Sequence, residues 1–117
     1  MSQYIDIHTA KDEIAQSRKN EKHVTGRFEN YQPGESHGIP YRCLTPKGLT
    51  NVLVAGRSIS TDRTVQGSTR VMPTCLVTGE AAGTAAAMAA DAGTTDVHAV
   101  DTARLRETLR NNGAYLP

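Results

Sequence analysis

The chain has 117 residues, enough for one small domain, and its 13 basic and 12 acidic side chains leave a net charge of +1. This balance gives no electrostatic case for nucleic acid or an anionic membrane as a partner, and no apolar run or signal-peptide pattern argues against a cytoplasmic protein. Leu, Ile, Val and Phe supply only 21 residues, so we expect the core to be completed by another chain, a cofactor, or a further part of the same protein.

The first half of the chain predicts two short strands separated by a charged excursion. In "QYIDIH" (3–8) polar residues alternate with two isoleucines, a pattern typical of a strand with one apolar face. Residues 9–37 are mostly polar or charged, so we expect a solvated segment there. "GIPYRCL" (38–44) predicts a second strand, and Pro40 places it at a sheet edge or marks its beginning.

A turn and a buried strand are expected next. "TPKGLTN" (45–51) has the proline and glycine of a turn. In "NVLVAG" (51–56) four apolar residues run without alternation, as in a parallel strand that is covered on both faces. The polar loop "RSISTDRTVQGST" (57–69) then leads to a helix.

Residues 70–93, "RVMPTCLVTGEAAGTAAAMAADAG", predict a long helix built mainly from alanine and glycine. Pro73 suits the first helical position, and Gly93 suits the residue just after the helix end. The polar stripe is narrow, so we expect most of the helix circumference to be buried. At about 100° per residue, one broad face contains only small side chains: Cys75, Gly79, Ala82, Gly83, Ala86, Ala89 and Ala90.

The two glycines of this face predict a close approach. Glycine inside a helix costs about 1 kcal/mol relative to alanine, so Gly79 and Gly83 suggest that another backbone or a flat ligand lies against them. Packing against a helix or a sheet, with no ligand involved, is the alternative interpretation.

A last helix is expected after a polar link. Asp101 predicts its N-cap, and the helix continues to residue 111 or 112, before Gly113. Leu105 and Leu109, four residues apart, form its buried seam.

The start of the long helix is a candidate anion site. Met72, which precedes Pro73 at the predicted N-cap, offers no oxygen to the first free amides. The strand at 51–56 leads the chain to the carboxyl edge of a sheet, where open α/β folds bind ligands. Together these features predict a cradle for a nucleotide or a flavin, although the chain contains neither a GxGxxG nor a P-loop motif.

The two cysteines, Cys43 and Cys75, have no metal-ligand spacing. We therefore expect no metal site, and we interpret both residues as buried free thiols.

The segment "GIPYRCLTPKGLTNVLVAGRSISTDRTVQGSTRVMPTCLVTGEAAGTAAAMAADAG" resembles the carboxy-terminal end of FAD-dependent oxidoreductases of the glutathione-reductase-like superfamily. The resemblance runs from about Gly38 to Pro117, with "YIDIH" a weaker match upstream. It implies an α/β fold, a partial FAD-domain (Rossmann-like) unit with one buried strand, a long Ala/Gly-rich helix and a C-terminal helix, plus short strands of a substrate domain. Residues 1–50 would be the substrate-domain strands and charged excursion, and residues 51–117 the C-terminal part of the FAD-binding domain.

The resemblance also implies site residues. Gly56, Arg57 and Ser58 match the segment near the ribityl and phosphate portion of FAD. The segment leading to the helix end that faces the isoalloxazine is matched by Gln66, Gly67, Ser68, Arg70, Val71 and Met72. A helix N-terminus stabilises the negative charge of reduced flavin by roughly 0.3–1 kcal/mol. An ion pair at the surface is the alternative role for Arg70.

Substrate and catalytic roles are less defined. Arg42 and His8 are candidate substrate contacts, with purely structural roles as the alternative. Many relatives have His where this chain has Arg63, so no proton-transfer role passes to that position, and the catalytic residue stays unknown.

The resemblance implies an oxidoreductase only when an N-terminal FAD-binding part with the glycine-rich turn completes the site. FAD is the expected cofactor of the complete protein, with weak or absent binding by this chain alone. The expected partner is that missing N-terminal portion or a second copy of the chain. Two alternatives stay open: a non-catalytic oligomerising or binding module, and a subunit of a split flavoenzyme.

Overall fold

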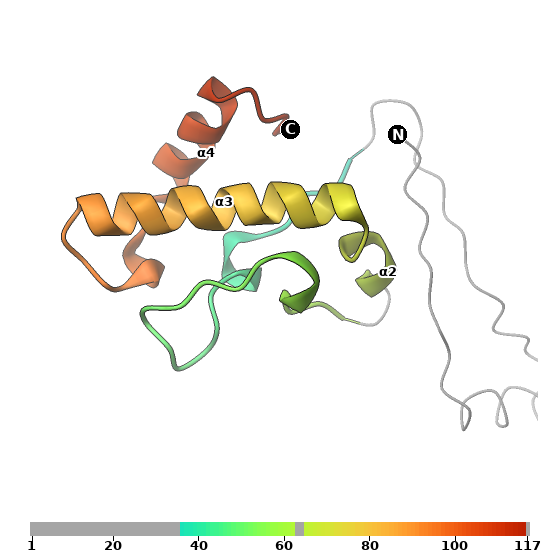
Figure 1. The fold of residues 1–117 in the computed structure, drawn as a ribbon, viewed down its shortest axis with the longest axis horizontal. Helices are drawn as coiled ribbons and strands as arrows, with labels where there is room; N and C mark the ends of the chain where they lie inside the picture. The colour runs from blue at the N-terminus through green and yellow to red at the C-terminus, as the bar shows by residue number, and fades with distance from the viewer. Residues whose placement is uncertain (1–35, 63–64, 117) are drawn as a thin grey trace, which may run out of the picture.

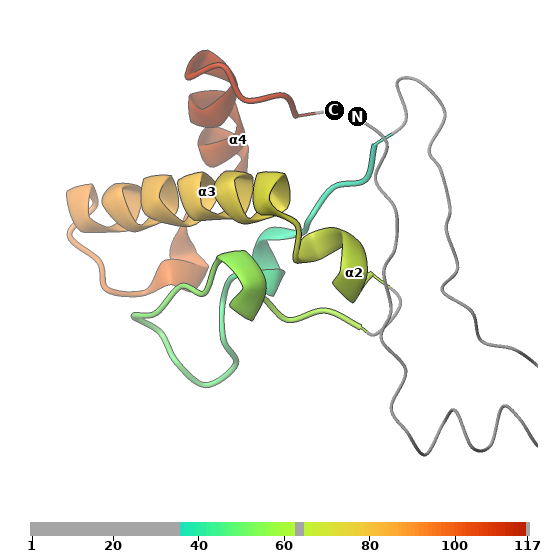
Figure 2. The same cartoon turned by 45° about the vertical axis from the view of Figure 1, so that its right-hand side comes forward.

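The computed structural model describes residues 36–62 and 65–116, and every structural statement below concerns these residues. A long helix, α3 (Met72–Asp91), runs through their centre. The helix α4 (Thr102–Asn111) crosses one side of α3, and the loop segments lie on the other side (Figures 1 and 2). The shorter elements are η1 (Tyr41–Cys43), η2 (Gly56–Ser58), α2 (Gln66–Thr69) and η3 (Val97–Ala99).

The predicted strands are not found. None of residues 36–62 and 65–116 lies in a β-strand, so the expected Rossmann-like α/β unit with a buried strand and short strands is wrong for this part of the chain. Residues 52–55 are without regular structure, and Ala55 is extended. The Val54 amide donates to the Leu44 carbonyl at 2.8 Å, but no ladder of such bonds develops within the described ranges. An apolar run becomes a strand only where a neighbouring strand pairs with it.

The segment 38–44 forms a 3₁₀ turn in place of its predicted strand. Pro40 has φ −62°, and its carbonyl accepts from the Cys43 amide at 2.9 Å. The Leu44 amide donates to the Tyr41 carbonyl at 2.9 Å, which forms a second, overlapping turn. The strand predicted at 3–8 lies outside the described residues.

Both ends of α3 agree with the sequence prediction to within one or two residues. The helix begins at Met72, one residue before Pro73, and its N-cap is Val71. It ends at Asp91, and Gly93 follows with φ +69°. This left-handed conformation ends the helix, and glycine adopts it without a steric penalty.

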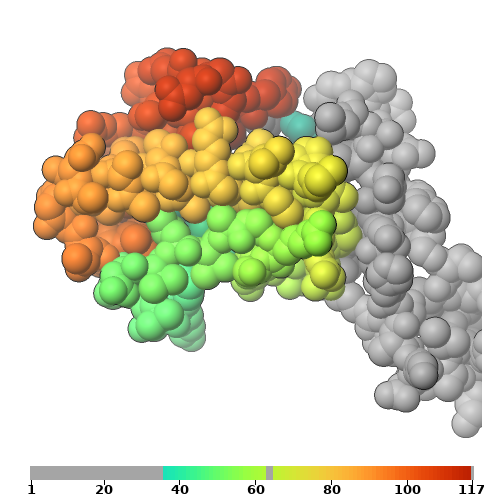
Figure 3. Space-filling view, in the orientation of Figure 1, coloured from blue at the N-terminus to red at the C-terminus, as the bar shows by residue number. Residues whose placement is uncertain are grey.

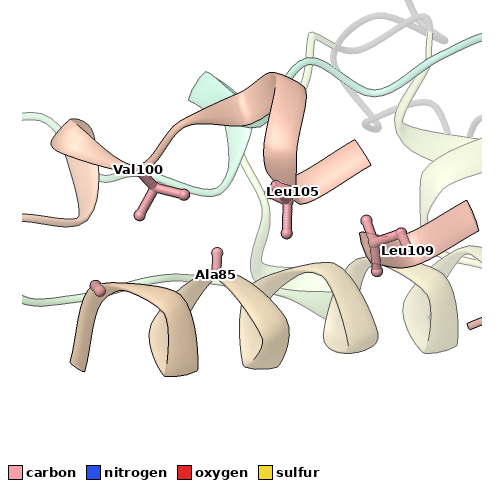
Figure 4. Packing of buried hydrophobic residues seen from close by; sticks show 5 residues of the cluster. Ala85, Val100, Leu105 and Leu109 are labelled. Atoms are coloured by element: carbon pink, nitrogen blue, oxygen red, sulfur yellow. The ribbon is translucent and has the colours of Figure 1, made fainter. Parts of the chain in front are cut away.

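The main core lies between α3 and α4. It consists of Ala85 and Ala89 of α3, Val100, and Leu105 and Leu109 of α4 (Figure 4). Since alanine has only a methyl group, the leucines of α4 reach close to the α3 backbone. The predicted seam of α4 is confirmed.

The N-cap prediction for α4 is also confirmed. A carboxylate oxygen of Asp101 accepts from the amides of Ala103 at 2.9 Å and Arg104 at 3.2 Å. These bonds satisfy two of the four amides that a helix start leaves without partners.

A second, smaller core on α3 fixes the segments before it. It consists of Leu44, Ile59 and Ala82. Ile59 directly follows η2, so its burial holds η2 near α3. The phenol of Tyr41 donates to the Val97 carbonyl at 2.7 Å and ties η1 to η3.

The prediction that most of the α3 circumference is buried is wrong within the described residues. Ala82 and Ala89 of the small-residue face are buried, but Gly79 and Gly83 are exposed, and a Cβ atom at either glycine would meet no atom within 4 Å. Figure 3 shows α3 lying open along one side of the molecule. Exposed apolar side chains on this helix include Met72 at 73%, Leu76 at 74% and Val77 at 55%.

Candidate cofactor-binding site

The turn η2 lies directly on α3. Gly56 begins the turn with φ +68°, a conformation that favours glycine. Its amide donates to the Thr78 hydroxyl at 3.0 Å. A Cβ atom at Gly56 would lie 3.9 Å from the Cβ of Cys75. The backbone of η2 therefore lies in contact distance of the first half of α3.

The side chain of Arg57 joins the two predicted cofactor segments. Its Nε donates to the Arg70 carbonyl at 3.2 Å. Gly56–Ser58 and Gln66–Met72 are separated by seven residues in sequence, and the fold brings them together. The side chains of Arg57, Ser58 and Arg70 are exposed, so they are accessible to a ligand.

The short helix α2 turns part of its polar surface inward. Ser68 is 2% exposed, and its hydroxyl donates to the Val65 carbonyl at 2.9 Å. The Ser68 carbonyl accepts from the hydroxyl of Thr74 at 3.0 Å. The Ser68 side chain therefore supports the backbone of α2, and it does not face outward as a ligand contact would.

The start of α3 has the electrostatics of an anion site. No side chain caps it, and its first turn contains no acidic residue. Pro73 has no amide hydrogen, so Met72 and Thr74 supply the amides of that turn. The positive end of the helix dipole and the nearby charge of Arg70 both favour a negative group here.

The other predicted site residues are spread over the described surface. Gln66 and Met72 are exposed, and Gly67 and Val71 are half-buried. Arg42 is exposed on η1. Its role as a substrate contact stays a prediction. His8 and Arg63 lie outside the described residues.

Cys43 and Cys75 are free thiols, and both are half-buried where full burial was expected. No group of three His, Cys, Asp or Glu side chains within the described ranges could hold a metal ion. In the same part of the chain no helix combines the length and hydropathy that crossing a membrane requires.

The sequence analysis missed two residues that support the site, Thr74 and Thr78. Both are buried on the inner side of α3, one helical turn apart, at 5% and 4% exposure. The available signal was their spacing of four residues, which places both hydroxyls on one face of a helix. The residues that accept or donate across that face could not be known without the tertiary structure.

Comparison with known proteins gives a family. A profile described as "FAD dependent oxidoreductase" matches residues 1–109. This chain belongs to the FAD-dependent oxidoreductase family. No curated protein and no solved structure matches the chain.

The residues at the start of α3 fit a group of the chemical kind of FAD. FAD combines an anionic pyrophosphate with an isoalloxazine that accepts and donates electrons. The uncapped amides of α3 and the exposed guanidinium groups of Arg57 and Arg70 suit negative charge. Gly56, whose positive φ favours glycine, adds a piece of backbone without a side chain next to these amides and guanidinium groups.

Proposed function

We propose that this chain supplies the flavin-facing segment at the carboxy-terminal end of an FAD-dependent oxidoreductase of the glutathione-reductase-like superfamily. One observation carries the proposal. The two segments that the sequence resemblance assigns to the cofactor, Gly56–Ser58 and Gln66–Met72, meet at the uncapped start of α3 through the bond from Arg57 to the Arg70 carbonyl.

Each element has a separate role in this proposal. The turn Gly56–Ser58 offers backbone and a cationic side chain to the ribityl and phosphate portion. The first turn of α3 directs its dipole towards the isoalloxazine, which carries the electron transfer when FAD is bound. Arg70 adds a positive charge beside that turn.

The proposal includes a partner. The exposed apolar side chains of Met72, Leu76 and Val77 lie on the first half of α3, the helix against which the cofactor segments lie. Large exposed apolar groups that gather on one element favour contact with another protein surface. We propose that an N-terminal FAD-binding part with the glycine-rich turn covers this face, and that without it the chain binds FAD only weakly, within the millimolar range, and does not catalyse.

The test of the cofactor role is an NMR titration of the ¹⁵N-labelled chain with FAD. We expect FAD to shift the amide signals of 56–58 and 70–74 and to leave those of α4 unchanged. ADP, which lacks the isoalloxazine, should shift fewer of these signals. Shifts confined to α4, or no shifts up to millimolar FAD, would contradict the proposal.

The matched control uses arginines of the two regions. Arg70→Ala should weaken the FAD-dependent shifts, because it removes a charge beside the start of α3. Arg104→Ala, at an exposed arginine of α4, should leave them unchanged. Equal effects of the two substitutions would mean that only the net charge of the chain matters.

Apart from a subunit of a split flavoenzyme, which a separate chain would complete, a second candidate is a non-catalytic binding module that associates through α3 with a second copy or with another protein. The observation in its favour is the 74% exposure of Leu76. Sedimentation velocity over a range of concentrations tests self-association. A monomer at all concentrations rejects the second copy and leaves the separate partner.

A further inference from the structure

The buried hydroxyl of Thr78 bonds on two sides. Its Oγ1 accepts from the Gly56 amide at 3.0 Å. The hydroxyl hydrogen points the other way, and it is shared between the Thr74 carbonyl at 2.8 Å and the Cys75 carbonyl at 3.1 Å. Such back-bonding is common for threonine in helices, and here the same oxygen also accepts a hydrogen bond from the amide of another segment.

The amide that donates to Thr78 belongs to Gly56, the residue at which the chain turns. Ala55 is extended, with φ −135° and ψ 174°, and Gly56 follows at φ +68° to open η2. The Thr78 hydroxyl therefore accepts from the amide at which the backbone changes from the extended to the left-handed conformation.

Besides the burial of Ile59, which follows η2 and packs with Ala82, the turn has one more polar attachment. It is the bond from Arg57 Nε to the Arg70 carbonyl at 3.2 Å, and the Arg57 side chain is exposed. Water competes for an exposed hydrogen bond of a long, flexible side chain, whereas the bond from the Gly56 amide is part-buried and ends on a threonine that is 4% exposed. Thr78 therefore contributes more to the position of η2 than Arg57 does.

Thr74 attaches the other cofactor segment to α3, as a donor where Thr78 is an acceptor. One turn earlier on the same face of α3, its hydroxyl donates to the Ser68 carbonyl at 3.0 Å. The two threonines thus attach η2 and α2 to one rigid helix at a spacing of one turn.

We propose that Thr78 is a positioning residue, which holds the turn Gly56–Ser58 at a fixed place beside the first half of α3. The ligand that this turn then faces is the FAD of the proposed function, on which that part of the inference rests. Thr78 itself is buried, so the proposal gives it no direct contact with the cofactor.

The test measures hydrogen exchange of the Gly56 amide by NMR in the full chain. Thr78→Val keeps the shape of the side chain and removes the acceptor, so exchange at Gly56 should become about tenfold faster or more. Thr78→Ser keeps the hydroxyl and should restore slow exchange. Equal exchange at Gly56 in the wild type and in Thr78→Val overturns the proposal.

Thr108→Val is the matched control. The Thr108 hydroxyl also donates to a carbonyl four residues earlier, that of Arg104, at 2.9 Å, but on α4. This variant should leave exchange at Gly56 unchanged. The amides of Leu105 and Leu109 report on the stability of the core between α3 and α4, and in Thr78→Val exchange at Gly56 should accelerate by more than exchange at these two amides.

If Thr78→Val unfolds the chain, Thr78→Cys decides. It retains a side chain of similar size with a poor acceptor, and exchange at Gly56 as slow as in the wild type would overturn the proposal. An FAD titration of the same variants tests the cofactor clause. We expect the shifts at 56–58 to need about fivefold more FAD in Thr78→Val than in Thr78→Ser. Identical titrations of the two reject that clause.

The two proposals fail in different ways. If FAD shifts no amide in the wild type, the proposed function is wrong, and the exchange at Gly56 still decides whether Thr78 holds the turn. If FAD shifts the amides of 56–58 but exchange at Gly56 ignores Thr78, the proposed function stands and the positioning role is wrong.

Discussion

In the second half of α3, Ala85 and Ala89 pack against Leu105 and Leu109 of α4. In the first half, the buried side chains are Thr74 and Thr78, and they bind neighbouring loops through hydrogen bonds. The first kind of contact is apolar and stabilises the fold within the chain. The second kind fixes the direction of loop backbones while the opposite side of the helix stays exposed.

The comparison connects stability and function. Apolar burial is not directional, so the packing of α4 tolerates small changes of angle. Hydrogen bonds lose strength quickly with misalignment, so they suit a site where backbone groups must face a ligand. The second half of α3 thus stabilises the fold, and the first half positions the neighbouring loops.

We expect the largest loss of stability from a substitution in the core that packs against the second half of α3. Leu105→Ala should lower the free energy of unfolding by about 2–5 kcal/mol, because Leu105 is 4% exposed and its removal leaves a cavity. Urea denaturation followed by circular dichroism measures this. Leu76→Ala, at 74% exposure on the other half, should change stability by less than about 0.5 kcal/mol. Similar losses for both would show that Leu76 is covered in solution.

The next effect concerns the turn at the site. Gly56→Ala forces a Cβ atom into φ +68° and should cost about 1–2 kcal/mol of stability. It should also weaken the FAD-dependent shifts at 56–58, since the backbone leaves its conformation to relieve the strain. Gly48→Ala, in a turn with φ +83° away from the site, should cost similar stability and leave the FAD response intact.

A pH-dependent effect is expected at Tyr41, which joins η1 to η3. Burial, and secondarily the negative charge of Asp96, raises the pKa of Tyr41 above its ordinary value of 10.0. The contribution to stability is therefore complete below pH 10 and is lost as the pH rises through the higher pKa of the folded state. Tyr41→Phe removes the bond to Val97, should cost about 1 kcal/mol at neutral pH, and should reduce the loss of stability above pH 10.

The matched control for this experiment is Tyr115→Phe, at a tyrosine that is 78% exposed. Thermal unfolding of the three proteins between pH 8 and 11 gives the comparison. A Tyr41→Phe curve that falls as steeply as the wild-type curve would show that other groups cause the loss.

We expect the smallest change of stability from a substitution on the exposed face of α3. Gly79→Ala should stabilise the chain alone by up to about 1 kcal/mol, because alanine favours the helix and no atom lies within 4 Å of the new methyl group. Ala86→Gly, on the same exposed surface, should destabilise it by a similar amount. A destabilising Gly79→Ala would indicate that another molecule covers this face in solution.

Local patterns in the sequence predicted α3 and α4 well, but not the short helix α2, which lies in the expected loop 57–69. Pro73 and Gly93 mark the two ends of α3, and Asp101 with Leu105 and Leu109 defines the cap and the seam of α4. These signals depend on a residue's own backbone preference or on neighbours within one helical turn. They therefore act before any distant part of the chain is in place.

The strand predictions at 38–44 and 51–56 failed for the complementary reason. Apolar runs say that a segment is buried, but a strand also needs a partner to pair with, and no such pairing forms within residues 36–62 and 65–116. The prediction of a buried small-residue face failed likewise at Gly79 and Gly83, because the pattern alone does not say which neighbour lies there.

By itself, the sequence determined where α3 and α4 begin and end, and which leucines of α4 face inward. The tertiary structure alone decided that Gly56 meets Thr78 across 22 positions and that Arg57 meets the Arg70 carbonyl. Caps and helical seams are local, whereas a hydrogen bond between distant segments exists only after packing has brought donor and acceptor to within about 3 Å.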